Sequence, residues 1–190
     1  IGAVVSLTEV EALVAKAYPD FAEVIRRFGS PPIRSTATLA GNIANGSPIG
    51  DSMPCLMALG TTLTLRCGDK TRSVSLDQFY TGQKQTVLQA GEFIEAVVLP
   101  KPQAGQVFRA HKVSKRFEQD ISATCAAITY TLKAGKLSNV KLAYYSQTTQ
   151  SWDARLVYDF ERKVNWKLGL TSSSIRRTLD TTTDLLAGHV

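Results

Sequence analysis

Residues 38–51 read TLAGNIANGSPIGD, and this short stretch decides how the rest of the chain is interpreted. Its alanines and glycines let the backbone approach a ligand closely, because they carry almost no side chain. Side chains that donate or accept hydrogen bonds are spaced through the same stretch, at Thr38, Asn42, Asn45 and Ser47. Asp51 and Ser52 are expected to cap a following helix, whose positive dipole end would then lie nearby. A polyoxygenated, phosphate-bearing ligand would find partners here.

The same stretch also has a simpler interpretation as turn chemistry. Asn-Gly and Ser-Pro are common in tight turns, and Asp51 can cap a helix without touching any ligand. The pattern is not a phosphate-binding P-loop, which needs Gly-Lys-Ser or Gly-Lys-Thr. It is not a Gly-x-Gly-x-x-Gly dinucleotide fingerprint either. Residues 32–50 show no sustained helical or strand period, so one long ordered loop is expected.

Helices are expected on both sides of this loop. Apolar residues recur at helical spacing over 7–17, where Thr8 and Glu11 read as a capping box, and again over 20–28. After the loop, the apolar residues over 52–60 predict a short buried helix that closes on a glycine. The first part of the chain is therefore expected to be mainly helical.

The remainder of the chain favours strands. Alternating apolar residues predict strands over 61–67, 70–74, 92–99, 107–113, 121–133 and 137–144. The first two form a hairpin, and residues 75–80 form one helical turn. Pro and Gly over 100–105 indicate a domain boundary near residue 103. The expected fold class is α+β, with mixed helices and antiparallel strands over 1–102 followed by a second, antiparallel domain.

Composition bounds the class of protein. The chain has 190 residues, 44% of them hydrophobic, which is enough to build a real core. It contains no apolar run long enough for a membrane helix and no basic lead of a signal peptide, so we expect a soluble protein of the cytoplasm. The net charge of +6 is scattered along the chain, which argues against nucleic acid as a partner.

The cysteines and histidines do not form a recognisable metal or disulfide pattern. Cys55, Cys67 and Cys125 are widely spaced among apolar or strand-like neighbours, so all three are expected to be buried thiols. His111 and His189 cannot complete a zinc site by themselves. We expect no metal bound within this chain and no side chain that acts as a catalytic acid or base.

Residues 35–51, taken together, resemble the second FAD motif of the xanthine dehydrogenase family. The likeness extends to Arg27-Phe28, Pro54, Leu59-Gly60, 108–116 and 120–122. The run SPIGDSMP over 47–54 resembles bacterial xanthine dehydrogenase small subunits more than the carbon monoxide dehydrogenase relatives. No cysteine-rich insertion suggests the hydroxybenzoyl-CoA reductase branch. The resemblance implies an FAD-binding domain and the start of the small C-terminal domain that follows it in this family.

The resemblance also implies a set of cofactor-binding residues. Those expected to line the FAD site are Phe28, Thr38, Asn42, Asn45, Ser47 and Asp51. Ile94 would pack near the cofactor, and Lys112 would reach the flavin from the second domain. Each residue has a structural alternative, since Phe28 and Ile94 can be plain core residues and Lys112 a solvated strand residue.

The function implied by the resemblance is that of an oxidoreductase subunit. Electrons from purine oxidation at molybdenum would pass through iron–sulfur clusters to FAD and then to NAD. The partners would be an iron–sulfur domain and a molybdenum-binding large subunit. Two alternatives stay open: another molybdenum hydroxylase that acts on an aldehyde, nicotinate or carbon monoxide, and a non-catalytic assembly module that no longer holds FAD.

The resemblance covers residues 1–144 and divides them into a FAD-binding domain over 1–102 and the start of the C-terminal domain over 103–144. Residues 145–190 match nothing in the family, receive no function, and are expected to pack poorly because they lack a sustained amphipathic pattern. The chain begins without Met and without the family's upstream Gly-rich pyrophosphate loop. We therefore expect a piece of a longer protein that, by itself, binds FAD weakly or not at all.

Overall fold

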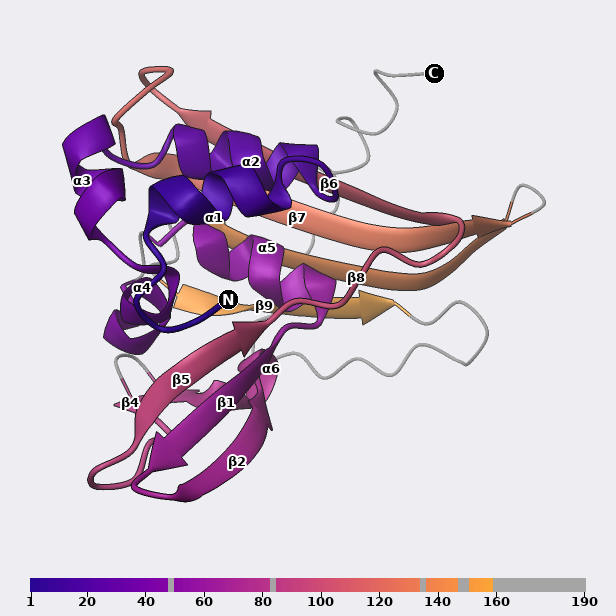
Figure 1. Ribbon diagram of the computed structural model, residues 1–190. Coiled ribbons are helices and arrows are strands. Elements are labelled where there is room, and N and C mark those ends of the chain that lie inside the picture. Colours follow the sequence, from indigo (N-terminus) through magenta and orange to yellow (C-terminus); the bar gives the residue numbers. More distant parts are fainter. Residues whose placement is uncertain (48–49, 83–84, 134–135, 147–150, 159–190) are drawn as a thin grey trace.

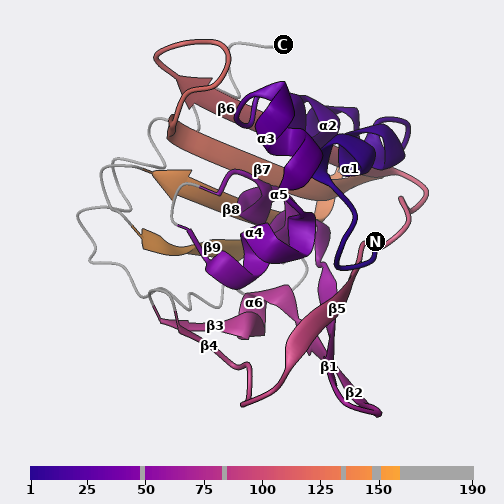
Figure 2. The ribbon, with the colours of Figure 1, turned by 60° about the vertical axis from the view of Figure 1, so that its left-hand side comes forward.

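The computed structural model describes residues 1–47, 50–82, 85–133, 136–146 and 151–158. Among these residues, short helices precede the strands, and the strands form antiparallel sheets of three, two and four strands. The helices of the first 60 residues lie against one face of the four-stranded sheet, and the three-stranded sheet lies below them in the view of Figure 1 (Figures 1 and 2). The α+β class expected from the sequence is confirmed.

The described part of the first 60 residues is mainly helical. Its helices are α1 (Leu7–Val14), α2 (Pro19–Arg26), α3 (Pro31–Thr36), α4 (Leu39–Asn45) and α5 (Ser52–Leu59). Helices α1 and α2 pack against each other, and α5 lies deepest, with all but one of its residues buried. Because α5 is apolar nearly all round, it can only be stable at the centre of the molecule.

The capping box of α1 differs from the expected one. The Ser6 hydroxyl accepts a hydrogen bond from the Glu9 backbone N–H at 3.3 Å, and the Glu9 carboxylate accepts one from the Ser6 N–H at 2.8 Å. Thr8 and Glu11 lie inside the helix instead. Both pairs have the same spacing, and the burial of Leu7 selects the earlier one, because the helix must begin early enough to turn that side chain into the core.

Residues 32–50 do not form the single long loop that was expected. Helix α4 begins after Thr38, whose hydroxyl accepts from the Gly41 N–H at 3.0 Å, and it ends at Gly46 with a positive φ of 55°. A Cβ on Gly41 would lie 2.8 Å from the Thr38 hydroxyl oxygen, so this glycine makes room for the cap. The small polar residues therefore begin and end helices too short to show a period in the sequence.

The smaller sheets follow α5. The three-stranded sheet has the order β2-β1-β5, from β1 (Thr62–Cys67), β2 (Lys70–Ser75) and β5 (Phe93–Val98). Between β2 and β5 lie α6 (Leu76–Phe79), β3 (Tyr80–Gly82) and β4 (Gln85–Thr86). The expected hairpin and helical turn are confirmed. The chain start runs beside β5, where the Val97 N–H donates to the Ile1 carbonyl at 2.8 Å.

The four-stranded sheet has the order β6-β7-β8-β9. Its strands are β6 (Gln106–Ser114), β7 (Ser122–Lys133), β8 (Lys136–Ser146) and β9 (Ser151–Tyr158). Helices α2 and α5 pack on one face of this sheet (Figure 1). On that face β6 buries Phe108, Ala110 and Lys112, whereas Arg109 and His111 point away and are exposed. A lysine therefore lies in the row of residues that faces the helices.

Strand β9 corrects the expectation for the tail. It pairs with β8 over Val140–Ser146, so part of residues 145–190 belongs to the sheet. Its sequence does alternate, with Trp152, Ala154, Leu156 and Tyr158 separated by mainly polar residues, and this was the missed signal. Residues 159–190 and the expected turn at 134–135 lie outside the described residues.

Two of the three cysteines are buried as expected. Cys55 on α5 and Cys125 on β7 lie in the core, and burial, with the neighbouring Cys125, raises the pKa of the Cys55 thiol. Cys67 is exposed, because it ends β1 at the hairpin turn. Among the described residues, no group of three or more His, Cys, Asp or Glu side chains is placed to hold a metal.

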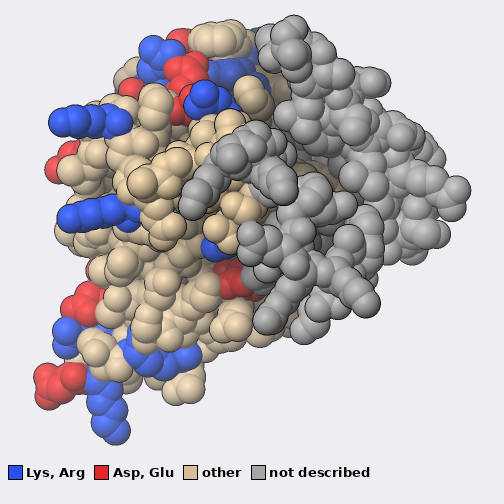
Figure 3. All heavy atoms as spheres, turned by 90° about the vertical axis from the view of Figure 1, so that its right-hand side faces the viewer, with Lys and Arg blue, Asp and Glu red and all other residues tan. Residues whose placement is uncertain are grey.

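Surface charges of both signs are interspersed. Figure 3 shows a face on which acidic and basic side chains stand together near the top and the bottom, with mainly uncharged residues between them. The described part of this face shows no continuous basic stripe of the kind that usually binds nucleic acid. None of the helices in the described part of the chain is both long and apolar enough to cross a membrane.

An ion pair between β2 and the segment before β5 predicts a pH dependence of stability. Arg72 donates to both oxygens of Glu92 at 2.7 Å, and this contact, together with the Gln89 N–H, lowers the pKa of Glu92 from 4.5 to about 2. A depressed pKa stabilises the folded state above pH 4.5, and this stabilisation is lost as the pH falls toward 2.

We expect Glu92→Gln to flatten the fall in the free energy of unfolding between pH 4.5 and pH 2, measured by urea denaturation. Glu118→Gln is the control, because Glu118 is exposed and has no ion-pair partner among the described residues. Parallel pH profiles for Glu92→Gln and the parent chain would contradict the assignment.

Candidate functional site

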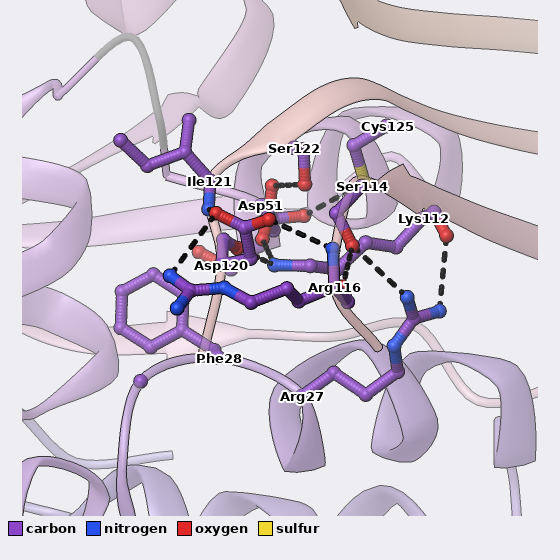
Figure 4. Close-up of polar contacts among 12 residues, drawn as sticks. Arg27, Phe28, Asp51, Lys112, Ser114, Arg116, Asp120, Ile121, Ser122 and Cys125 are labelled. Atoms are coloured by element: carbon purple, nitrogen blue, oxygen red, sulfur yellow. Dashed lines mark hydrogen bonds and ion pairs between the residues drawn. The ribbon is translucent and has the colours of Figure 1, made fainter. Parts of the chain in front are cut away.

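Asp51 lies at the entry to α5 but does not cap it. One carboxylate oxygen accepts a hydrogen bond from the Lys112 ammonium at 2.5 Å, and the other accepts from the Ser122 hydroxyl at 2.5 Å (Figure 4). The backbone of Asp51 is already helical, with φ −64° and ψ −17°, whereas a capping residue is normally extended. The expected cap is therefore wrong, and the carboxylate is directed toward the large sheet.

Lys112 is buried and not solvated, contrary to the alternative considered from the sequence. Its side chain and that of Asp51 are each 2% exposed. The ammonium also donates to the backbone carbonyl of Asp120 at 2.9 Å, so two of its three N–H groups have partners among the described residues. Because Asp51 precedes α5 and Lys112 lies on β6, this ion pair joins the helical part of the chain to the sheet.

A small hollow of about 10 Å³, with room for about one water molecule, brings together three of the expected site residues. Phe28, Asn42 and Asp51 line it, together with Ser52 and apolar side chains of α1 and α2. The Asn42 side-chain oxygen accepts from the Ser52 hydroxyl at 2.6 Å. The Asn42 amide nitrogen has no partner in the part of the chain that the structure describes, so it can donate to a ligand.

The backbone at Gly50, beside this hollow, is tightly packed against neighbouring polar groups. A Cβ on Gly50 would lie 3.2 Å from the Ser47 carbonyl oxygen and 3.3 Å from the Asn42 side-chain oxygen. A side chain at position 50 would therefore push against the polar groups that line the hollow. The glycine keeps these groups close together at the entry to α5.

The other expected residues lie elsewhere around α4. Thr38 uses its hydroxyl oxygen to cap α4, and Asn45 is exposed at the other end of that helix. The Ser47 carbonyl accepts from the Gly50 N–H at 2.9 Å. Ile94 is buried on β5, a strand that contacts α4. The structure thus brings Phe28, Asn42, Asp51 and Lys112 into one region. Ile94 is not among the described residues that line the hollow.

Arg27 holds the connection between β6 and β7 against α2. Its guanidinium donates to the carbonyls of Lys112 at 2.9 Å and Phe117 at 2.8 Å, and to the Ser114 hydroxyl at 3.2 Å. The guanidinium carbon also lies 4.5 Å from the centre of the Phe117 ring. Figure 4 shows Arg27 reaching this connection from below. Arg27 thereby fixes the backbone at Lys112 and at Phe117, ahead of Asp120, whose carbonyl accepts from the Lys112 ammonium.

Asp120 stabilises the same connection from within. Its carboxylate accepts from the backbone N–H groups of Arg116 and Ile121, each at 2.9 Å, and these bonds lower the pKa of Asp120. This order fixes the Asp120 carbonyl, which accepts from Lys112.

Sequence reasoning missed the supporting residues of the site, namely Arg27, Ser52, Asp120 and Ser122. All four stand in or beside the quoted motifs, yet the sequence offered no signal for their partners. Ser122 lies 71 residues from Asp51, and Arg27 lies 85 residues from Lys112. Contacts of that separation follow from the fold.

Comparison with known proteins decides the family. Residues 1–102 match the family described as the FAD binding domain in molybdopterin dehydrogenase. The chain belongs to this family. It is 31% identical over 212 aligned residues to the xanthine dehydrogenase/oxidase of Gallus gallus, a match that covers 94% of this chain and 16% of the relative.

Other relatives carry the same domain. The chain is 30% identical to a nicotinate hydroxylase of Emericella nidulans, over 71% of this chain and 11% of that protein. In structure it is similar to a reconstituted CO dehydrogenase from Oligotropha carboxidovorans, with a TM-score of 0.70 and 26% identity, over 76% of this chain and 51% of that one. The chain thus spans between about a tenth and a half of the length of these relatives.

The buried ion pair predicts a large loss of stability when it is broken from one side. Lys112→Met leaves the Asp51 carboxylate buried without its cation, so we expect the free energy of unfolding to fall by about 3–5 kcal/mol. Urea denaturation followed by circular dichroism measures the effect.

The double variant Asp51→Asn with Lys112→Met should recover much of that loss, because the amide carries no charge and still accepts from Ser122. Lys70→Met, at an exposed position on β2, is the matched control and should change stability by less than about 0.5 kcal/mol. A Lys112→Met variant within about 1 kcal/mol of the parent chain would show that the pair is not closed in solution.

Proposed function

We propose that this chain is the FAD-binding electron-transfer part of a xanthine dehydrogenase. Electrons from hypoxanthine or xanthine, oxidised at molybdenum, pass through iron–sulfur clusters to FAD and then to NAD. The observation that carries the proposal is the buried ion pair of Asp51 and Lys112, beside Phe28 and Asn42, inside a domain of the FAD-binding family. An iron–sulfur domain and a molybdenum-binding large subunit are the proposed partners.

The residues of the hollow suit a flavin. Phe28 offers a half-buried aromatic surface on which a flat ring system can pack. Asn42 offers an amide donor to a carbonyl or ribityl oxygen of the cofactor. When bound, FAD would supply hydride transfer together with one-electron exchange with iron–sulfur clusters.

The charged pair has a defined role in this proposal. Asp51 holds the Lys112 ammonium in place, and the remaining N–H of that ammonium can donate to an oxygen of the flavin. A cation fixed beside a flavin favours the reduced, more negative form and so raises its reduction potential. Thr38, Asn45, Ser47 and Ile94 are proposed to complete the site around α4.

The proposed division of the chain follows the same lines. Residues 1–102 form the FAD-binding domain, and residues 103–144 form the start of the C-terminal flavoprotein domain, to which β9 adds a strand. The ion pair between Asp51 and Lys112 then crosses the boundary between the two domains. Residues 145–190 receive no separate function.

A second candidate function is the same role in another molybdenum hydroxylase. The likeness to a nicotinate hydroxylase and to a CO dehydrogenase favours this alternative, because these relatives share the domain and differ in substrate. Anaerobic reduction of the flavin in the assembled complex by xanthine, nicotinate or carbon monoxide separates the candidates. Reoxidation by NAD or by oxygen then identifies the electron acceptor.

The cofactor itself can be tested on this chain. We expect the fluorescence of FAD to decrease when the cofactor is titrated with the protein. Asn42→Leu should weaken FAD binding about tenfold, because one hydrogen bond to the cofactor is lost. Gln78→Leu, which removes an exposed amide from α6, is the control and should bind FAD like the parent chain. Equal affinity for all three proteins would remove Asn42 from the site.

A further inference from the structure

Ser122 occupies a position on β7 that regular alternation of the strand would not give it. Cys125 and Thr129 are buried on the face of the sheet toward α5, where they donate to the carbonyls of Asp51 and Ala58. Alternation back from Cys125 would bring Ala123 to that face and turn Ser122 away from it. Instead, Ser122 is 0% exposed, whereas Ala123 is half-buried. The strand is therefore irregular just before Cys125.

The irregularity is an extra residue in β7 opposite the end of β6. The single step from Val113 to Ser114 on β6 is matched by two steps on β7, and Ala123 is the residue without an opposite number. Such a bulge turns the side chains beyond it to the other face of the sheet, and bulges are frequent beside functional sites because they re-aim a side chain. Here the bulge brings Ser122 to the face on which Lys112 lies.

The re-aimed hydroxyl binds the oxygen of Asp51 that Lys112 does not use. Ser122 donates to Oδ1 at 2.5 Å, and the Lys112 ammonium donates to Oδ2 at 2.5 Å (Figure 4). An ionised carboxylate can only accept hydrogen bonds, so the Ser122 hydroxyl is the donor. Each oxygen of Asp51 therefore has its own donor, from a different strand of the sheet.

This division of the carboxylate leaves one N–H of Lys112 for a ligand. Among the described residues, one N–H of the ammonium goes to Asp51 and another to the Asp120 carbonyl. Without the Ser122 hydroxyl, Oδ1 would be buried with no donor, which is unfavourable, and it would take the third N–H of the cation already bound to Oδ2. A lysine held by both carboxylate oxygens has no N–H left to donate elsewhere.

We propose that Ser122 is a positioning residue of the flavin site. Its hydroxyl holds the Asp51 carboxylate so that Lys112 presents its remaining N–H to the cofactor. The inference rests on the proposed function, because the group that receives this N–H is an oxygen of the flavin. Ser122 acts through Asp51 and Lys112, and the bulge at Ala123 is the backbone feature that places it.

The first test needs no cofactor. NMR of the 190-residue chain with isotope-labelled lysine side chains records the ε-methylene signal beside the Lys112 ammonium. We expect this signal to shift in Ser122→Ala, because the ammonium gains the second oxygen of Asp51. Ser138→Ala, which removes a hydroxyl that donates to the Thr131 carbonyl in the same sheet, is the matched control and should leave the signal in place. An identical Lys112 signal in Ser122→Ala and the parent chain would overturn the inference.

The second test measures the reduction potential of the flavin in the assembled complex, by redox titration followed by absorbance. Ser122→Ala should lower the potential by the amount that corresponds to about a threefold loss of preference for the reduced flavin, because the cation no longer donates to it. Ser138→Ala should leave the potential unchanged. An unchanged potential in Ser122→Ala with flavin bound would overturn this inference alone. An assembled complex that holds no flavin would overturn the proposed function together with it.

Discussion

The ammonium of Lys112 and the carboxylate of Asp51 lie 2.5 Å apart and are almost completely buried. Removing two charges from water costs several kcal/mol for each ion, and only close pairing with further hydrogen bonds offsets that cost. The Ser122 hydroxyl and the Asp120 carbonyl supply those bonds. The connection between β6 and β7 must therefore be ordered before the pair is stable, and the packing of α5 on the sheet depends on the same contact.

This constraint explains the arrangement around it. Arg27 ties α2 to the backbone of Lys112 and Phe117, and Asp120 orders the turn from within. Neither residue touches the Asp51 carboxylate. Arg27 fixes the backbone of Lys112, and Asp120 fixes the carbonyl that accepts from the Lys112 ammonium. The helices and the sheet are thus joined by polar contacts at one end of α5 and by apolar contacts along the rest of it.

The proposed flavin role follows from the same arrangement. A lysine whose charge is balanced by a fixed carboxylate can lie near a cofactor without drawing water into the site. Asn42 and Phe28 stand beside that carboxylate and present an amide and an aromatic surface. In the proposed role, a site preorganised in this way would hold a flavin in one orientation, which a hydride or electron transfer requires.

The sequence by itself determined the fold class, the central buried helix, most strands and the family. The alternation of apolar residues in β1 and the repeating small and polar residues of 38–51 carry that information locally. The family motif also predicts that Asp51 and Lys112 lie near a common cofactor. It could not determine that they bind each other, because the two residues are 61 positions apart and the spacing carries no sign of that contact.

Other differences have similar physical causes. Residues 39–45 are helical because tertiary packing buries Leu39 and Ile43, and seven residues are too few for a period to be visible. Asp51 does not cap α5 with its side chain, because its backbone is helical and its carboxylate pairs with the Lys112 ammonium on β6. Local patterns therefore determined most helices and strands. The tertiary structure decided the short helices of the expected loop and which charged groups meet, since only the folded chain brings β6 against the entry to α5.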